Sequence, residues 1–211
     1  MTRRALLLAV SLLAAQAAFA ARTVMIFGDS LSAAYNLSAG EGWVDLLDKR
    51  IASARLPWHV VNASVSGETT SGGASRLAAD IKRNRPAIVV IQLGTNDGLR
   101  GLPIAGIRDN LERMIRMVRQ ARAEPVLVGL MIPPNYGIDY TREFTGMYTS
   151  LAAQYKVALV PFLLEGVADK PDLFQRDQLH PTAAAQPRIA DNVWPSIEPL
   201  LRKGAPAAQS K

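Results

Sequence analysis

The chain has 211 residues, with no Cys, two His, a formal net charge of +6 and 49% hydrophobic residues. This length suits one domain with a core of its own, and the absence of Cys excludes disulfide frameworks, thiolate metal sites and thiol nucleophiles. Two imidazoles are too few for a histidine-based metal site, so His59 and His180 are the candidates for imidazole acid–base chemistry.

Residues 1–20 have the pattern of a secretory signal peptide. A pair of arginines precedes an apolar run over residues 5–15, and the segment ends in Ala-Phe-Ala. The run is shorter than the ~20 apolar residues of a spanning helix, which favours cleavage after Ala20 over a membrane anchor. Cleavage would leave 191 of the 211 residues and 22 of the 24 Lys and Arg against 18 acids, a net charge of +4. We therefore expect a periplasmic or secreted protein.

Short apolar runs alternate with stretches of helical periodicity along the mature chain. Five runs predict strands, over residues 23–27, 58–62, 87–93, 126–131 and 157–161. Four amphipathic stretches predict helices, over residues 43–51, 74–81, 104–118 and 144–155. Continuous apolar strands separated by helices indicate a parallel sheet covered on both faces. We expect one α/β domain over residues 21–203, followed by a flexible tail over residues 204–211.

The residues after each strand are where chemistry is expected, because ligands bind at the carboxyl ends of the strands in an open parallel sheet. Four of the five segments that follow the strands are rich in small, polar, turn-forming residues. The segments are residues 28–32, 63–69, 94–98, 132–137 and, well after the last strand, 177–181.

Four of these segments carry the parts of a serine hydrolase. Ser30 follows the first strand on an abrupt turn, and a serine needs a base to become a good nucleophile. His180 can be that base, and Asp177, three residues earlier, can orient the imidazole. The backbone N–H groups of Ser30 and Gly67 and the side-chain amide of Asn96 could converge on a developing oxyanion.

Four motifs together resemble the sequence blocks of the SGNH, or GDSL-type, hydrolases, in the order of that family. They are Gly28-Asp29-Ser30-Leu31, Gly67, Gly94-Thr95-Asn96-Asp97 and Asp177-Gln178-Leu179-His180-Pro181. Each motif alone is typical of an ordinary turn, but independent turns have no reason to follow this order at successive strand ends.

The resemblance implies a flavodoxin-like three-layer α/β/α sandwich with a five-stranded parallel sheet. It also implies Ser30 as nucleophile, His180 as base, Asp177 as its orienting acid, and an oxyanion hole made by Ser30, Gly67 and Asn96, without metal or other cofactor. Residues 62–69, 98–102 and 134–137 are similar to the bacterial periplasmic branch of thioesterases, lysophospholipases and arylesterases.

One departure from the family follows the His-Pro pair, where Thr182 and Ala185 replace the Asn and Gly that are common in the family, and Pro187 comes next. Because a proline inside a helix removes a backbone donor, we expect the terminal helix to start late or to kink near Pro187.

The expected function is a secreted serine esterase that acts on acyl esters or thioesters through an acyl-enzyme. Residues 98–107 and 132–138 would flank the serine with apolar atoms that could receive an acyl chain. The candidate substrate contacts are Asp97, Leu99, Leu102, Pro134 and Tyr136. The expected partners are a small acyl ester or lipid and, transiently, membrane lipids, with neither nucleic acid nor an obligate protein partner.

Two alternatives stay open at this point. A carbohydrate O-acetylesterase would use the same catalytic set with a more polar crevice. A non-catalytic binding protein would use the same residues as turns. The Gly-x-Ser-x-Gly elbow, the Ser-x-x-Lys motif and the glycine-rich nucleotide loops are missing from the sequence, which argues against other common enzyme classes. His59 lies at the start of a strand, where a structural role is expected.

Overall fold

The structure, a computed structural model, describes residues 21–204. The predicted signal peptide and residues 205–211 of the predicted tail lie outside the described residues. The strands are β1 (Arg22–Gly28), β2 (Trp58–Asn62), β3 (Ile88–Gln92), β4 (Glu124–Val128) and β5 (Ala158–Val160). The helices are α2 (Trp43–Ser53), α3 (Thr70–Asn84), α4 (Thr95–Leu99), α5 (Ile104–Gln120), α6 (Ile138–Tyr155) and α7 (Gln186–Lys203). Short 3₁₀ turns are η1 (Pro134–Tyr136), η2 (Pro171–Leu173) and η3 (Ala183–Ala185).

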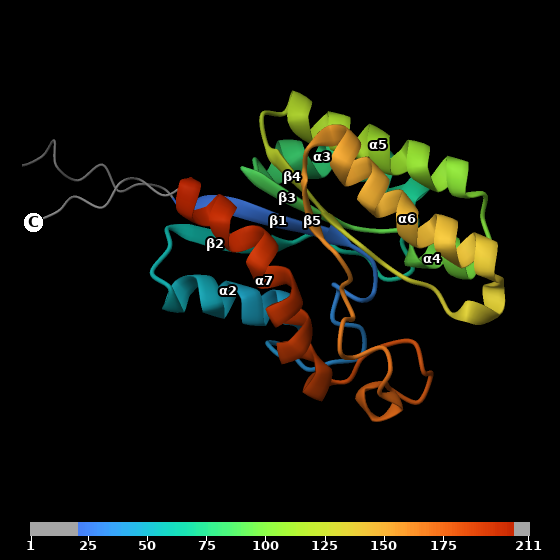
Figure 1. Cartoon of the computed structure of the whole chain (residues 1–211). Coiled ribbons are helices and arrows are strands. Elements are labelled where there is room, and N and C mark those ends of the chain that lie inside the picture. Colours follow the sequence, from blue (N-terminus) through green and yellow to red (C-terminus); the bar gives the residue numbers. More distant parts are fainter. Residues whose placement is uncertain (1–20, 205–211) are drawn as a thin grey trace, which may run out of the picture.

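The five strands form one parallel sheet in the order β2-β1-β3-β4-β5. Helices α3, α5 and α6 cover one face, and α2 and α7 cover the other (Figure 1). β3, at the centre, is buried along its whole length, as the apolar residues 88–91 require, and the polar Gln92 at its end is buried too. The predicted three-layer α/β/α sandwich with a five-stranded parallel sheet is confirmed. The turns that follow β1, β2 and β3 therefore lie next to one another at one edge.

Several helices and strands begin or end at other residues than predicted, mostly because polar residues extend an element beyond its apolar stretch. β4 begins at Glu124 rather than at residue 126, because the Glu124 N–H donates to the Ala87 carbonyl at 2.9 Å although the side chain is exposed. β4 ends at Val128, and the apolar residues 129–131 leave the sheet. Helices α3 and α6 begin four and six residues before their predicted starts, in polar first turns without apolar periodicity.

The terminal helix begins at Gln186, directly after the 3₁₀ turn η3. Pro187 falls in its first turn, where a backbone N–H has no acceptor within the helix, so proline is accommodated there. Two further prolines, Pro195 and Pro199, lie inside the helix. The late start near Pro187 is thus explained by the 3₁₀ turn that precedes the helix.

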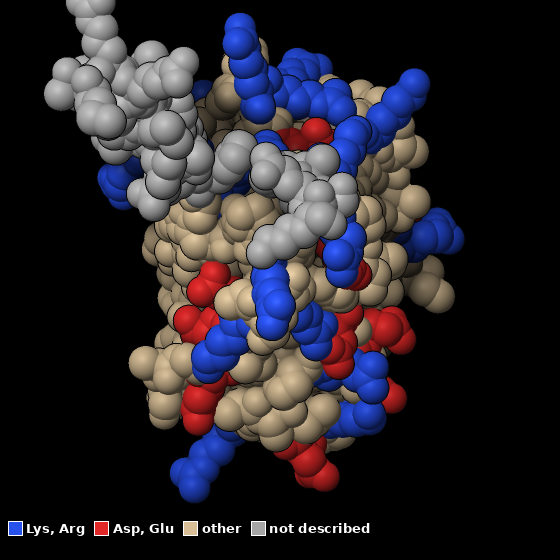
Figure 2. Space-filling view, turned by 90° about the vertical axis from the view of Figure 1, so that its left-hand side faces the viewer, with Lys and Arg blue, Asp and Glu red and all other residues tan. Residues whose placement is uncertain are grey.

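Charged side chains of both signs share the surface at the amino ends of the strands, opposite the edge where the turns after β1, β2 and β3 lie. Figure 2 shows the side of the molecule that is on the left in Figure 1, with Lys and Arg interspersed with Asp and Glu. Within residues 21–204, no helix is long and apolar enough to cross a membrane.

Candidate active site

The turn after β1 carries Ser30 and is held by side chains from two other elements. The Leu31 carbonyl accepts a hydrogen bond from Trp43 Nε1 at 3.0 Å. The Ser32 carbonyl accepts one from Asn62 Nδ2, at the end of β2, at 2.7 Å. The chain therefore reverses directly after the strand, and the Ser30 side chain lies in the crevice at the carboxyl edge of the sheet.

Gln92, the last residue of β3, reaches the same turn from the neighbouring strand. Its Oε1 accepts from Ser32 Oγ at 2.5 Å, and its Nε2 donates to Asp29 Oδ1 at 3.0 Å. Gly28 passes so close that a Cβ there would stand 2.6 Å from Gln92 Oε1. Glycine is therefore required before the turn, which explains why Gly precedes Asp29 in this motif.

Asp29 is the buried acid of the turn. Burial raises the pKa of its carboxyl to about 6, although hydrogen bonds from the Leu31 amide and the Gln92 side chain and the charge of His180 lower it. The Thr95 hydroxyl lowers this pKa as well, although Thr95 Oγ1 makes no hydrogen bond among the described residues. Asp29 Oδ2 consequently has no hydrogen-bond partner among the described residues.

Ser30, His180 and Asp177 form one chain of hydrogen bonds. His180 Nε2 lies 2.9 Å from Ser30 Oγ, and His180 Nδ1 lies 2.7 Å from Asp177 Oδ2. The N–H groups of His180 and Leu179 both donate to Asp177 Oδ1, at 3.0 Å each. These two bonds and the one from the His180 side chain lower the pKa of Asp177 to about 2. An ionised Asp177 requires the proton on Nδ1, which leaves Nε2 to accept from Ser30 Oγ.

Three N–H donors are available on neighbouring strand ends. The backbone N–H groups of Ser30 and Gly67 make no hydrogen bond to another residue within the part of the chain that the structure describes. The Asn96 amide donates one of its two N–H groups to the Glu68 carbonyl at 2.9 Å, so the second remains for a ligand. Unpaired donors next to a serine are what an oxyanion requires.

The segment between β2 and α3 is fixed on both sides of Gly67. On one side, the Val65 N–H donates to the Gly28 carbonyl at 3.0 Å. On the other side, Thr70 donates to the buried Asp97 carboxylate through its N–H at 2.9 Å and its hydroxyl at 2.6 Å. Gly67 has a φ of +78°, a conformation that favours glycine. Hydrogen bonds on both sides of Gly67, together with the positive φ of Gly67 itself, therefore fix the backbone of this segment.

The GDSL-like lipase/acylhydrolase family model matches residues 26–187. The chain belongs to this family. Esterase TesA of Pseudomonas aeruginosa is 49% identical over 194 residues, which cover 92% of this chain and 96% of the relative. Thioesterase 1/protease 1/lysophospholipase L1 of Escherichia coli K12 is 42% identical over 184 residues, 87% of either chain. The solved structure of the psychrotrophic esterase EstA from Pseudoalteromonas, inhibited by monoethylphosphonate, is 40% identical with a TM-score of 0.81, and the match covers 86% of this chain and 99% of that chain.

The predicted enzyme class is confirmed by this membership. The chain is a GDSL-type esterase, and the sequence resemblance that the four motifs indicated is correct. Within residues 21–204, His, Asp and Glu side chains do not gather in groups of three that could hold a metal ion.

An apolar cavity of about 510 Å³ opens beside Ser30 and His180 of this GDSL hydrolase. Two segments form most of its wall. The segment after β4 contributes Leu130, Met131, Ile132, Pro133 and Pro134. The segment between β5 and Asp177 contributes Phe162, Leu164, Ala168, Pro171 and Phe174. The second group was not predicted, because these apolar residues have neither helical nor strand periodicity. Their persistence through an irregular segment was the available signal.

The predicted substrate contacts divide between the cavity and other places. Leu99 and Pro134 line the cavity. Leu102 and Tyr136 lie outside its lining, and the Tyr136 hydroxyl donates to the Leu99 carbonyl at 2.8 Å. Asp97 is buried, and both of its carboxylate oxygens are bonded to Thr70. The structure therefore places Asp97 behind the site, where it cannot reach a substrate.

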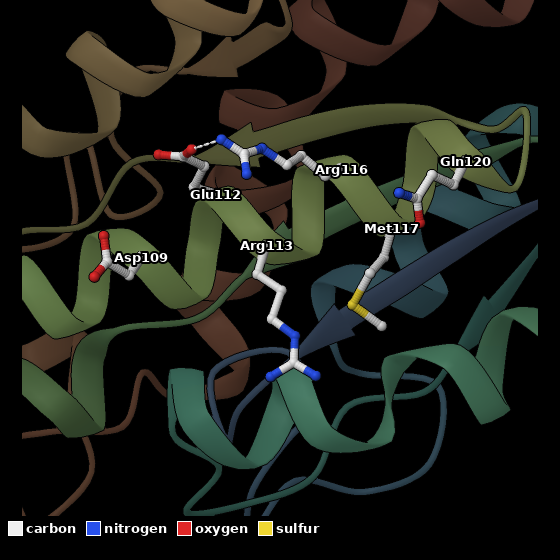
Figure 3. A pocket seen from close by; sticks show the side chains of 6 residues that line it. All are labelled: Asp109, Glu112, Arg113, Arg116, Met117 and Gln120. Atoms are coloured by element: carbon white, nitrogen blue, oxygen red, sulfur yellow. Dashed lines mark hydrogen bonds and ion pairs between the residues drawn. The ribbon is translucent and has the colours of Figure 1, made fainter.

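A second hollow, of about 400 Å³, lies on the outer surface of α5. Figure 3 shows that its six lining side chains all come from this one helix, with Arg116 paired to Glu112. It holds no nucleophile and lies apart from the strand ends, so it is a feature of a charged helix surface and not of the reaction centre.

Proposed function

We propose that Ser30 is the nucleophile of an acyl-transfer reaction and that His180 and Asp177 activate it. The observation that carries the proposal is the continuous hydrogen-bond chain from Ser30 Oγ through His180 to Asp177. Ser30 Oγ attacks the acyl carbonyl carbon while its proton passes to His180 Nε2. The imidazolium then protonates the leaving alcohol or thiol, and water hydrolyses the acyl-enzyme with His180 as base.

The oxyanion of each tetrahedral intermediate is held by the Ser30 and Gly67 N–H groups and by the free N–H of Asn96. Support comes from the absence of other partners for the two backbone donors within residues 21–204. Asp177 stabilises the imidazolium that forms and keeps the ring in the tautomer that accepts the serine proton.

The substrates are esters or thioesters with an aliphatic or aryl acyl group, including lysophospholipids. The wall beside Ser30 is built from leucine, isoleucine, methionine, proline and phenylalanine side chains, which favour an acyl chain over the hydroxyls of a sugar. The names of the relatives, an esterase and a thioesterase/lysophospholipase, agree with this choice. A carbohydrate O-acetylesterase is correspondingly disfavoured.

Transient contact with lipid surfaces belongs to the same proposal. The large hydrophobic side chains that are exposed in the described part of the chain all lie on segments near the strand carboxyl ends. They are Tyr35, Val65, Leu102, Met131, Tyr136, Ile138 and Leu179. Two of them, Met131 and Leu179, also line the cavity. Exposed apolar side chains at the cavity would let an acyl chain pass from a lipid assembly into it with little exposure to water.

Export to the periplasm or medium is proposed from residues 1–20 alone. Amino-terminal sequencing of the protein after secretion is expected to begin at Ala21. A full-length, cytosolic product would contradict export and leave the enzymatic proposal untouched.

The decisive experiment combines covalent labelling with turnover. A serine-directed phosphonate is expected to label the wild-type protein once, at Ser30, and to abolish hydrolysis of p-nitrophenyl butyrate. Ser30→Ala is expected to be unlabelled and inactive while keeping the Tm of the wild type. Full turnover by Ser30→Ala would refute the assignment of the nucleophile. The non-catalytic alternative predicts an unlabelled wild type.

A further inference from the structure

Ser30 and His180 reach each other from segments that lie 150 residues apart in the sequence. Ser30 belongs to the turn after β1, and His180 belongs to the loop that precedes α7. A shift between these segments would change the Ser30–His180 distance directly. Contacts that join the two segments therefore set how well the nucleophile and base are aligned.

The side chain of Gln175 makes such contacts in both directions. Toward the nucleophile segment, its Nε2 donates to the Tyr35 carbonyl at 3.0 Å, and its Oε1 accepts from Asn36 Nδ2 at 3.0 Å. Toward the histidine loop, the same Nε2 donates to the Pro181 carbonyl at 3.1 Å. The amide oxygen and both hydrogens on the amide nitrogen thus all take part in hydrogen bonds.

The main chain of Gln175 is fastened to the catalytic histidine as well. Its N–H donates to the His180 carbonyl at 2.8 Å, and its neighbour Phe174 forms an antiparallel bridge with Pro181. Both the side chain and the main chain of Gln175 are therefore hydrogen-bonded to the loop that carries the imidazole.

The segment that Gln175 holds also contacts the imidazole itself. The Tyr35 ring packs on the His180 ring with 4.3 Å between centroids and an interplanar angle of 35°. Tyr35 lies at the end of the turn that Ser30 begins, since its N–H donates to the Ser30 carbonyl at 3.3 Å. Holding the Tyr35 carbonyl thus fixes both the end of the nucleophile turn and the aromatic surface against which the imidazole rests.

We propose that Gln175 is a positioning residue, whose side-chain amide clamps the nucleophile turn to the histidine loop and so sets the Ser30–His180 alignment. The proposal rests on the catalytic roles assigned above. Apart from the Ser30–His180 bond, the side-chain hydrogen bonds between residues 29–37 and residues 173–182 are those of Gln175. Gln175 does not line the acyl cavity. It lines a separate hollow between the two segments that it joins, so the role assigned to it is to position other residues and not to bind the acyl group.

The test separates alignment from binding by measuring kcat and KM. Gln175→Ala removes the clamp. Gln175→Glu keeps the size of the side chain and its ability to accept from Asn36, but sets carboxylate oxygens against the Tyr35 and Pro181 carbonyls. In both variants kcat for p-nitrophenyl butyrate is expected to fall about 10- to 100-fold, the size of effect that a small misplacement of reacting groups produces. KM should stay within about twofold, because the cavity is intact.

Arg176→Ala is the matched control, since Arg176 lies on the same exposed loop and makes no hydrogen bond or ion pair to another residue within 21–204. It is expected to keep the wild-type kcat. Turnover is counted per active site titrated to completion with the phosphonate, so a variant that folds only in part is scored on its folded fraction. The rate of phosphonylation should fall with kcat in the two Gln175 variants.

Wild-type kcat per titrated site in Gln175→Ala and Gln175→Glu would overturn the positioning role, and so would a change confined to KM. These outcomes leave the proposed function standing as long as Ser30→Ala is inactive. Turnover by Ser30→Ala would instead remove the proposed function, on which the positioning role depends.

Discussion

Asp29 and Asp177 both belong to the candidate active site around Ser30, and their environments move their pKa values in opposite directions. Asp29 is enclosed, and one of its oxygens has no partner among the described residues, so burial raises its pKa to about 6. Asp177 is partly exposed and accepts two backbone N–H bonds as well as the imidazole, so hydrogen bonding lowers its pKa to about 2. The same side chain is thus kept charged in one place and made hard to ionise in the other.

Asp177→Asn is expected to lower kcat by about 10²- to 10⁴-fold with little change in KM. The Asn Oδ1 can keep the Leu179 and His180 N–H bonds, which places Nδ2 against His180 Nδ1. Because the amide Nδ2 can only donate, His180 Nδ1 must accept. The ring proton then lies on His180 Nε2, which cannot take a proton from Ser30. Steady-state kinetics with p-nitrophenyl butyrate check this, and a kcat within threefold of wild type would contradict the tautomer argument.

Asp29 makes the stability of the protein depend on pH. The pKa of its carboxyl is 3.8 by reference and about 6 in the folded state, so between these values the folded state binds more protons than the unfolded one. The free energy of unfolding should therefore be highest below pH 3.8 as far as this group is concerned, and fall as pH rises through about 6. The size of the contribution is about 3 kcal/mol.

Asp29→Asn should remove this dependence. The amide keeps the acceptor for Leu31 and Gln92 and places an N–H where Oδ2 has no partner among the described residues. Urea unfolding at pH 4.5 and pH 7.5 checks the prediction: the wild type should lose stability relative to the variant across this interval. Parallel curves for the two proteins would show that Asp29 is ionised without penalty.

At the scale of elements, the hydrogen bonds between α3 and α4 fix the position of Gly67 relative to Asn96. Thr70, the first residue of α3, donates twice to Asp97 in α4, and its hydroxyl accepts from Asn110 Nδ2 in α5 at 3.1 Å. Thr70→Val keeps the shape and removes the hydroxyl. We expect a loss of about 1–3 kcal/mol in the free energy of unfolding, because a buried carboxylate oxygen loses its donor.

Ser75→Ala is the control for Thr70→Val, since Ser75 lies on the same helix and its exposed hydroxyl bonds only to the Ser71 carbonyl among the described residues. Its unfolding free energy should stay within about 0.5 kcal/mol of wild type. Equal unfolding curves for all three proteins would show that the Thr70–Asp97 contact contributes nothing net.

Helices and strands could be predicted from the sequence where burial of one face gives a regular spacing of apolar residues. They were harder to predict where local hydrogen bonds determine where an element begins and ends. The apolar face of α5 repeats over residues 104–118, and the helix is found at Ile104–Gln120. Helix α4 spans only Thr95–Leu99, which is too short for any period to be visible. The N-terminal turn of α3 depends on the Thr69 hydroxyl, which accepts from the Gly72 N–H at 3.2 Å, a local bond that apolar periodicity does not reveal.

At the scale of the whole molecule, the cavity between the β4 and β5 segments should set acyl-chain preference. Each methylene moved from water into it contributes up to about 0.8 kcal/mol, so kcat/KM should rise up to about fourfold per carbon until the cavity is filled. Ala168→Trp, which adds bulk at an exposed lining position, should shift the preference to shorter chains while acetate turnover is kept.

A series of p-nitrophenyl esters from acetate to decanoate measures this preference. Ala121→Trp is the control, because Ala121 follows α5 at the opposite end of the sheet and is exposed. An unchanged chain-length profile in Ala168→Trp would place the acyl group elsewhere.

The sequence by itself determined the α/β class, the parallel sheet and the residues that carry the family resemblance, because apolar runs and turn motifs are local patterns that burial and backbone geometry force on the chain. Only the tertiary structure decided which residues that are distant in the sequence contact one another. It placed Asp97 behind the site against Thr70, brought Phe162 and Phe174 into the cavity wall, and set Gln175 between the nucleophile turn and the histidine loop. Those relations join residues far apart in the chain, and only the packed fold determines them.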